Sequence, residues 1–486
     1  SSPAQAAPCT LHHSCLSTVP MWDQLPAPSF QDHAPVSGGS LLQLSHVGNR
    51  TEDSSFQAQA CLTAPSCAAG LLALAFAACL LGALRAYPAG SKDGKPARNP
   101  HVDNAKFLGM VLVCWSHIGP MVIHGHSYTF EAEDVIWFHM PLFAFLSGNF
   151  VRPFSPQVLL KTFVGLVMPL LFYIVFLYPP AETLQLRSFG WTGRFPYLEG
   201  SAWDVLTGPG PGYIIWFLRC LIIWRLLAML VASQPVALQV AVAAFCGMVG
   251  VYCGPEKTLN PLNCGTFAYQ RALLLYPFYC MGQHLDIQGL LDASPAPSRT
   301  TVLLTWTCLM SLIFLECQPK LWKAVTFGVF DVLDTSFGPF LRYSIPSGCA
   351  NDYFLLWARY LGCLAYRTAW LLIFLFFGVP RDETWFSEAG SHTLYAYLLH
   401  QPFPRYVAFA LPKLGELLGW ERVLAMPELL KYLGFLLLAF FLNLYFVGVV
   451  YATSSKPVRG VFGVLIEPSW LLRLPGLSQV GRKDVD

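Results

Sequence analysis

Charged side chains are scarce in this chain. Lys, Arg, Asp and Glu make up 12% of its 486 residues, whereas a soluble domain carries about 25%. The formal net charge is only +2, so the broad basic field on which nucleic-acid binding depends is missing. Apolar residues reach 55% and the mean hydropathy is +0.48. These values exclude an ordinary soluble enzyme and indicate a multi-pass integral membrane protein that contacts lipid and no nucleic acid.

Metal-binding patterns are also missing. None of the 15 cysteines forms a CxxC pair or a Cys/His cluster at zinc spacing, so we expect no metal. Cys114, Cys220, Cys280 and Cys308 lie inside apolar runs and are interpreted as small buried hydrophobes. Cys253 and Cys264 could form a disulfide across one loop, which requires the oxidising side of the membrane.

Long apolar runs predict an all-α helical bundle of about ten core membrane spans plus one helix before them. A bilayer core of about 30 Å needs roughly 20 apolar residues per span. The expected core spans are 104–124, 133–151, 157–178, 212–232, 235–254, 268–286, 300–318, 353–378, 391–410 and 428–453. The expected segments are a disordered region at 1–60, an extra transmembrane helix at 61–86, a hinge at 87–100, the membrane domain at 101–470 and a tail at 471–486.

Basic residues in the short connections predict the orientation of the bundle. Positive charge concentrates in the hinge and in the tail after residue 453, and such loops face the cytoplasm. Ten core spans place both segments on one side, so we expect the start of the core and the C-terminus to be cytoplasmic. The loops 179–211 and 319–352 then face outward. The sequence leaves open whether the membrane is the plasma membrane or an internal one.

Two polar residues share one apolar helix. Eleven residues separate Lys106 from His117, which returns to nearly the same helix face about 16 Å further along. Lys106 is then expected at the cytoplasmic mouth, one turn after Asp103, and His117 near mid-membrane. A snorkelling lysine and a structural histidine are the alternatives. Ionisable residues inside a span are otherwise candidates for function, and imidazole can serve as a general base.

The pair and five further segments resemble the acyltransferase-3 family of membrane O-acyltransferases. Lys106-x10-His117 is similar to the family's Arg/Lys-x10-His signature, and the other segments follow in family order. These segments are WFHMPLFAFLSGNFVR (137–152), YIIWFLRCLIIWRLL (213–227), FAYQRALLLYPFYCMGQHL (267–285), GSHTLYAYLLHQPF (390–403) and SSKPVRGVFGVLIEP (454–468). The resemblance covers about 98–470 and is greatest to the branch containing fucose 4-O-acetylase-like proteins.

The resemblance implies an O-acetyltransferase that uses acetyl-CoA from the cytoplasm and acetylates a hydroxyl, usually of a carbohydrate, at the other face. It implies that His117 acts as general base or helps to relay the acyl group, and that Lys106 steers the donor. The family often carries an arginine-rich turn where this chain has only Lys161. The CoA phosphates are therefore expected to contact Arg152, Lys161 and Arg225, and a non-catalytic member stays open.

Other polar residues have weaker assignments. The oxyanion of acyl transfer needs hydrogen-bond donors, for which Ser147, Asn149 and His139 are candidates. Structural roles are expected for two further histidines, His284 and His400, and for most of the arginines in or near spans, which are Arg219, Arg225, Arg271, Arg359 and Arg367. His124 and His126 would face outward near the acceptor entrance, with a solvated loop as the alternative to an acceptor-site role. The alternative function is a non-enzymatic transporter or sensor, which discontinuous helices and inverted repeats would favour; no repeat is visible.

Overall fold

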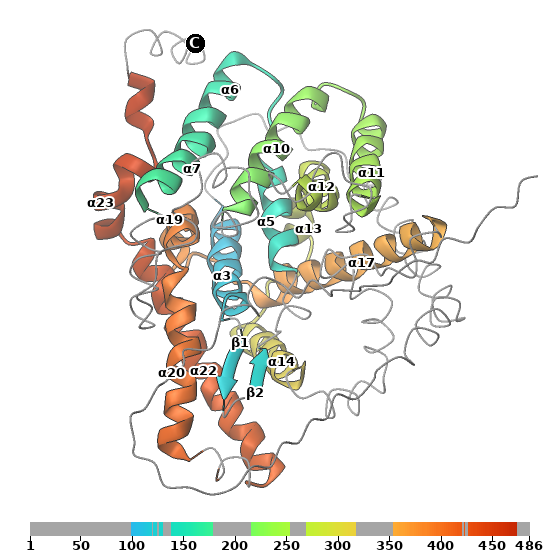
Figure 1. Ribbon diagram of the computed structural model, residues 1–486. Helices are drawn as coiled ribbons and strands as arrows, with labels where there is room; N and C mark the ends of the chain where they lie inside the picture. The colour runs from blue at the N-terminus through green and yellow to red at the C-terminus, as the bar shows by residue number, and fades with distance from the viewer. Residues whose placement is uncertain are drawn as a thin grey trace, which may run out of the picture. The chain divides into compact units, whose positions relative to one another are not determined.

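A computed structural model describes residues 99–118, 120–123, 126–129, 138–177, 215–252, 269–316, 353–419, 422 and 426–473 (Figure 1). The predictions for 1–60, for the helix at 61–86, for His124 and for a Cys253–Cys264 disulfide lie outside these residues. So do most of the hinge, most of the tail and the two outward loops.

The described chain is mainly helical. Its elements in order are α3 (Pro100–Ser116), β1 (Pro120–Ile123), β2 (His126–Thr129), α5 (His139–Gly148), α6 (Pro156–Thr162), η2 (Phe163–Val167), α7 (Met168–Phe172), η3 (Tyr173–Leu177), α10 (Trp216–Val231), α11 (Val236–Tyr252), α12 (Tyr269–His284), α13 (Ile287–Asp292), α14 (Arg299–Glu316), α17 (Tyr353–Ile373), η7 (Phe374–Gly378), α18 (Ser387–Ser391), α19 (Thr393–Leu399), α20 (Pro402–Leu418), α22 (Glu428–Thr453), α23 (Lys456–Ile466) and η8 (Ser469–Arg473).

Helices occur at each of the ten expected core positions, but not all have the expected length. Three described helices are long and apolar enough to cross a membrane: Pro156–Phe176, Tyr360–Gly378 and Leu433–Thr453. Val236–Val251 is apolar but shorter. Elsewhere the described helical segments are shorter or more polar, as in α5, which has 10 residues. The described residues therefore support a membrane protein without confirming ten full-length spans.

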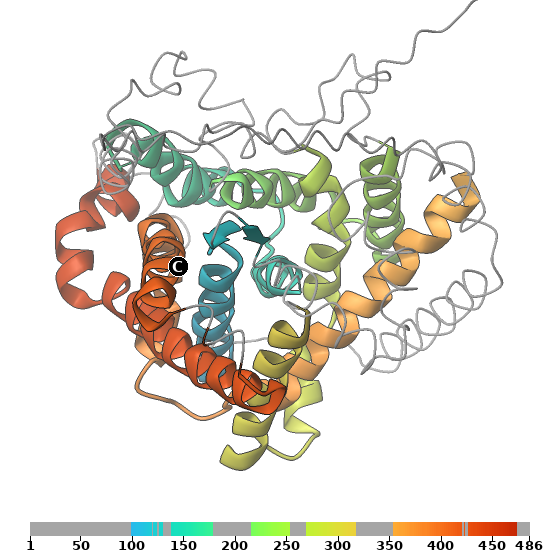
Figure 2. The same cartoon turned by 60° about the horizontal axis from the view of Figure 1, so that its bottom comes forward.

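Helix α3 is the centre around which other elements pack. Its neighbours include α5, α18, α19, α20 and α22, and Figure 2 shows it beside α5 with other helices around the two. Nearly every residue from Asp103 to Trp115 is buried. Side chains on all faces of α3 are therefore enclosed, as expected for an apolar helix inside a bundle. At its far end, Trp115 donates a hydrogen bond of 2.9 Å to Asn443 on α22.

The expected span 104–124 is wrong at its C-terminal end. The helix stops at Ser116, and Pro120–Ile123 pairs antiparallel with His126–Thr129, Met121 opposite Tyr128. Proline lacks the amide hydrogen that a continuing helix needs, so Pro120 favours this change to extended chain. The hairpin is an exception to the all-α prediction and lies beside α20 (Figure 1).

The expected span 391–410 is also interrupted. Three helices occupy this region, α18, α19 and α20, and the second break falls at His400 and Gln401. Pro402 begins α20; its fixed φ suits the first turn of a new helix and its ring disfavours continuation of the previous one. His400 thus lies at a helix end rather than in the middle of a regular helix.

The connections that follow α12 and η7 lie together at the N-terminal end of α3. The Asn99 side chain contacts Gln288, which follows α12. Arg381, which follows η7, donates a bond of 2.6 Å to the Ser294 carbonyl. Asn104 donates to the carbonyls of Pro380 and Asp382 at 3.0 and 2.9 Å. These contacts join the start of α3 to segments that are far from it in the sequence.

Two glycines bring α5 and α12 into backbone contact. A Cβ atom at Gly148 would lie 2.0 Å from the Tyr279 carbonyl oxygen, and one at Gly282 would lie 1.8 Å from that of Phe145. Both distances are far below contact distance, so only glycine permits this crossing. Small residues are the usual means by which helices approach closely in membranes. The contact fixes α5, and with it His139, against the rest of the bundle.

Candidate active site

The first turn of α3 is held firmly before Lys106 is reached. Asn99 caps the helix by accepting bonds from the amides of His101 and Val102, at 3.0 and 3.4 Å, and Pro100 occupies the first helical position. The Asn104 carboxamide oxygen accepts bonds from the hydroxyls of Thr384 and Ser387, at 2.9 and 2.7 Å. These contacts fix the rotation of α3, which decides where its polar stripe points.

Lys106 lies one helical turn beyond Asp103, as predicted. Its ammonium is 3.8 Å from the Asp103 carboxylate and 5.1 Å from the centre of the Phe150 ring. The lysine side chain is 25% exposed and the aspartate side chain 8%. A positive charge is therefore held at the accessible end of an otherwise enclosed helix, where it can attract an anionic ligand.

His117 caps the other end of the same helix. Its Nδ1 atom is 2.8 Å from the carbonyl oxygen of Val113 and 3.1 Å from the Ser116 hydroxyl oxygen. A carbonyl only accepts hydrogen bonds, so the proton of a neutral His117 ring sits on Nδ1. The Nε2 atom then carries the lone pair and is the basic atom of this side chain.

His400 lies against His117. The ring centres are 5.0 Å apart and the planes meet at 87°. His400 is completely buried, and its Nδ1 atom lies 2.8 Å from the Tyr397 carbonyl oxygen and 3.1 Å from that of Ala396. The structural hydrogen bond expected for His400 is thus present. The contact with His117 was not predicted, because the two residues are 283 positions apart in the sequence.

The cations expected to bind CoA phosphates lie on two helices. Arg152 precedes α6 and Lys161 lies in its last turn, and both are exposed. Arg225 is half-buried in α10, with its guanidinium near the hydroxyl of Tyr279. The exposed pair is therefore open to solvent or a ligand, whereas Arg225 lies partly inside the bundle.

The candidate oxyanion donors differ in their surroundings. His139 is buried at the start of α5, and Ser147 is half-buried near the end of this helix. The Asn149 amide donates to the Phe145 carbonyl at 3.3 Å. The Asn149 amide is thus used within its own helix.

Four other polar residues of the helices are buried or half-buried. Arg219 and Arg367 are 5% and 3% exposed, and Arg271 stacks on the Trp216 ring at 4.8 Å. His284 lies 3.1 Å from the Gln239 carboxamide oxygen. These contacts agree with structural roles for Arg271 and His284. The structure describes the backbone of Arg359 and His126 but not their side chains.

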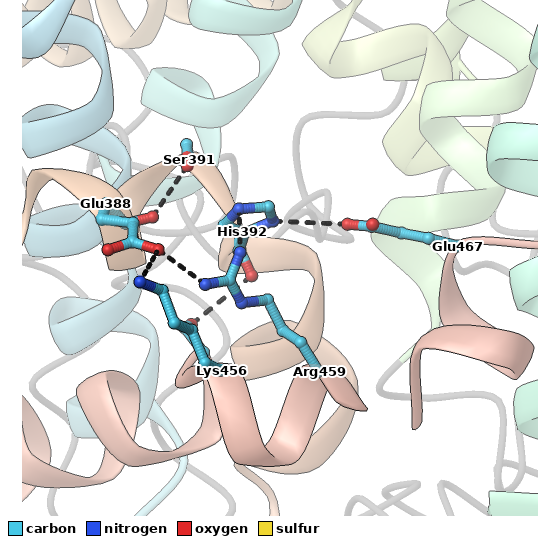
Figure 3. A network of polar contacts seen from close by, with 7 residues as sticks. Glu388, Ser391, His392, Lys456, Arg459 and Glu467 are labelled. Atoms are coloured by element: carbon cyan, nitrogen blue, oxygen red, sulfur yellow. Dashed lines mark hydrogen bonds and ion pairs between the residues drawn. The ribbon is translucent and has the colours of Figure 1, made fainter. Parts of the chain in front are cut away.

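Sequence reasoning missed a polar network that joins α18 to α23 (Figure 3). The Glu388 carboxylate lies 2.7 Å from the Arg459 guanidinium and 3.8 Å from the Lys456 ammonium. His392 contacts Arg459 through Nε2 and lies 3.4 Å from the Glu467 carboxylate through Nδ1. The hydrogen bond from Arg459 holds the pKa of Glu388 below its usual value, and Lys456 contributes in the same direction.

This network lies at the same end as Lys106. Helix α18 packs on α3 so closely that a Cβ at Gly390 would lie 2.0 Å from the Asp103 carbonyl oxygen. Lys456 and Arg459 thus pair with Glu388 on α18, and α18 packs directly against α3 at Asp103. Among the described residues, no group of three or more His, Cys, Asp or Glu side chains is arranged to hold a metal ion.

Comparison with known proteins identifies the family. A family model described as an acyltransferase domain, Acyl_transf_3, matches residues 99–452. The chain therefore belongs to the acyltransferase-3 family, whose members are membrane acyltransferases. No curated protein and no solved structure matches the chain. The likeness to the branch of fucose 4-O-acetylase-like proteins stays a prediction.

Proposed function

We propose that this protein is a membrane O-acetyltransferase. Acetyl-CoA would bind at the cytoplasmic end of the bundle, where Lys106 lies, and the acceptor would be a hydroxyl of an extracytoplasmic or lumenal carbohydrate. The arrangement of α3 carries this proposal. One enclosed helix holds a cation at its accessible end and, about 16 Å further along, a histidine with a basic Nε2 atom at a helix terminus.

His117 supplies the general base that attack of a hydroxyl on a thioester requires. The acceptor hydroxyl oxygen forms a bond to the acetyl carbonyl carbon while its proton moves to Nε2 of His117. The carbon–sulfur bond then breaks, CoA leaves as a thiolate, and the proton passes from His117 to the sulfur. Imidazole suits both transfers because it titrates near neutral pH. The Nδ1 bond to the Val113 carbonyl keeps the ring in the required tautomer.

Lys106 suits the donor end of the reaction. CoA carries several phosphate charges, and a lysine ammonium is a compact point charge that binds such groups from one side. The Asp103 carboxylate at 3.8 Å and the Phe150 ring beneath the ammonium hold it in place. Arg152 before α6 and Lys161 in its last turn, which are both exposed, would add further positive charge for the phosphates.

The test is acetyl transfer by purified protein in nanodiscs, with radiolabelled acetyl-CoA and a mixed glycan pool. We expect His117→Gln to lower kcat by 100-fold or more, since general acid–base groups contribute roughly 10² to 10⁴. Lys106→Met should mainly raise the KM for acetyl-CoA. His284→Gln is the matched control, because it changes an intramembrane histidine that bonds to Gln239 instead. Full turnover by folded His117→Gln protein would refute the assignment.

The interrupted helices keep a second function under consideration. Discontinuous helices mark the binding sites of many transporters, and the chain breaks at His400 and Gln401 between α19 and α20. A transporter would move a carbohydrate or an acyl-CoA across the membrane without consuming the thioester. Uptake into proteoliposomes without release of free CoA would favour that function over acetyl transfer.

A further inference from the structure

His400 has one satisfied nitrogen and one without a partner. Its Nδ1 atom is within hydrogen-bond distance of two carbonyl oxygens, those of Ala396 and Tyr397. Carbonyls only accept, so Nδ1 carries the proton and Nε2 is left as an acceptor. Among the residues that the structure describes, Nε2 of His400 has no hydrogen-bond partner, although it is buried. A buried polar atom without a partner is costly and calls for a functional explanation.

His117 and His400 share the same local backbone environment. Each lies at the end of a helix, each is tied through Nδ1 to a carbonyl four residues earlier, and each precedes a proline by two or three positions. Both rings therefore present Nε2 on the edge away from their own backbone. Their centres are 5.0 Å apart, so an imidazolium on one ring is in direct contact with the other.

We propose that His400 is the positioning residue for His117 in acyl transfer, which rests on the proposed function. When the acceptor loses its proton, His117 becomes an imidazolium. The neutral His400 ring, with its Nε2 lone pair, stabilises that cation and fixes the orientation of the His117 ring. The role matches that of the third group in other nucleophile–base arrangements, which orients the base and supports its charged form.

Burial dictates that the pair holds one proton rather than two. His400 is completely enclosed, and two imidazolium rings in contact at low dielectric would repel strongly. Titratable groups on the helices around the pair include Cys114 on α3, Arg219 and Cys220 on α10, Tyr397 on α19, Tyr406 on α20 and Tyr445 on α22. The described carboxylates of α3 and α20, Asp103 and Glu416, lie 14 residues from His117 and 16 residues from His400 along these helices, which is too far to compensate a second proton closely.

Two substitutions separate this role from a purely structural one. Asparagine at position 400 replaces the donor at Nδ1 and omits Nε2, whereas glutamine places a polar group near the Nε2 position. If His400 acts through Nε2, His400→Asn should lower kcat by about 10- to 100-fold, as loss of an orienting partner typically does, with both KM values within about twofold. His400→Gln should recover a large part of kcat. His284→Asn, which alters the contact with Gln239, is the control.

Labelling with ¹⁵N-histidine in liposomes gives a readout that does not require turnover. The His117 ring resonances should shift in His400→Asn and stay unchanged in His284→Asn, and the wild-type pair should take up a single proton on acidification. Full kcat in His400→Asn, or a His117 signal indifferent to position 400, would overturn the proposal. Absence of acetyl transfer by the wild type, with the His117–His400 coupling intact, would instead reject the proposed function and leave the pairing standing.

Discussion

The contact between Gly148 and Tyr279 allows a stability prediction of definite size. In Gly148→Ala the new Cβ would stand 2.0 Å from the Tyr279 carbonyl oxygen, whereas real Cβ atoms essentially never approach closer than 3.0 Å. Helices α5 and α12 must then separate by about 1 Å. The oxygen belongs to the backbone and the position of a Cβ is fixed by its own backbone, so no side-chain rotation relieves the clash. Overpacking of this kind typically costs 1–3 kcal/mol.

Thermal unfolding of the detergent-purified protein measures the effect. A loss of 1 kcal/mol lowers Tm by roughly 2–4 °C in a domain of 150–250 residues and by less in a larger chain, so we expect a decrease of a few degrees. Gly448→Ala on α22 is the control, because a Cβ there meets nothing within 4 Å, and alanine favours a helix. Equal Tm values for Gly148→Ala and Gly448→Ala would show that α5 and α12 do not cross at Gly148.

Three further predictions concern the Lys106 end of the bundle. His101 precedes the membrane span, and burial, with a smaller contribution from Arg381, lowers its pKa to about 4 from an ordinary value of 6.5. As the pH falls, the unfolded chain binds the proton before the folded one, so the free energy of unfolding should rise by about 3 kcal/mol from pH 4 to 6.5. His101→Phe should flatten this dependence when unfolding is measured against pH. Asn104→Leu removes two donated and two accepted bonds and should lower stability by about 2–4 kcal/mol, seen as a reduced Tm; an unchanged Tm would contradict the network. Arg459 lowers the pKa of Glu388, so the ion pair between α18 and α23 should persist above the ordinary carboxyl pKa and weaken as the pH falls through the lowered value. Protease cleavage near residue 467 should therefore increase at acid pH, and Glu388→Gln should abolish that increase.

The sequence located most helices because apolar runs and their terminal signals are local. The expected ranges 235–254 and 428–453 differ by at most two residues from the observed α11 and α22. Pro235 and Pro427 stand directly before these helices, where proline is favourable. Here hydropathy and capping agree, so the boundaries follow from the residues alone.

The two wrong boundaries share a cause. Hydropathy treated 104–124 and 391–410 as continuous spans, although Pro120 and Pro402 interrupt both. Both spans were predicted from the length of the apolar run, without allowing for a helix break at the proline. The signal was present, since a proline two or three residues after an intramembrane histidine marks a helix end. Reading it would have placed His117 and His400 at termini.

The pairing of distant residues was beyond the sequence. Lys106 and Asp103 share one turn, so their contact followed from helical spacing and is confirmed. His117 and His400, or Gly148 and Gly282, meet only because particular helices pack together. One sequence contains no statement of which spans are neighbours, and hydropathy is the same for every arrangement. The roles of Arg152, Lys161 and Arg225 stay predictions for the same reason.

Transfer across a sealed membrane tests the central claim most directly. Proteoliposomes would carry the protein with a glycan acceptor inside and radiolabelled acetyl-CoA outside, beside vesicles that contain His117→Gln. We predict acetylated glycan inside the wild-type vesicles, free CoA outside in equal amount, and neither product above background with His117→Gln. Intact acetyl-CoA with no internal product, from protein shown to be folded and correctly inserted, would contradict the account.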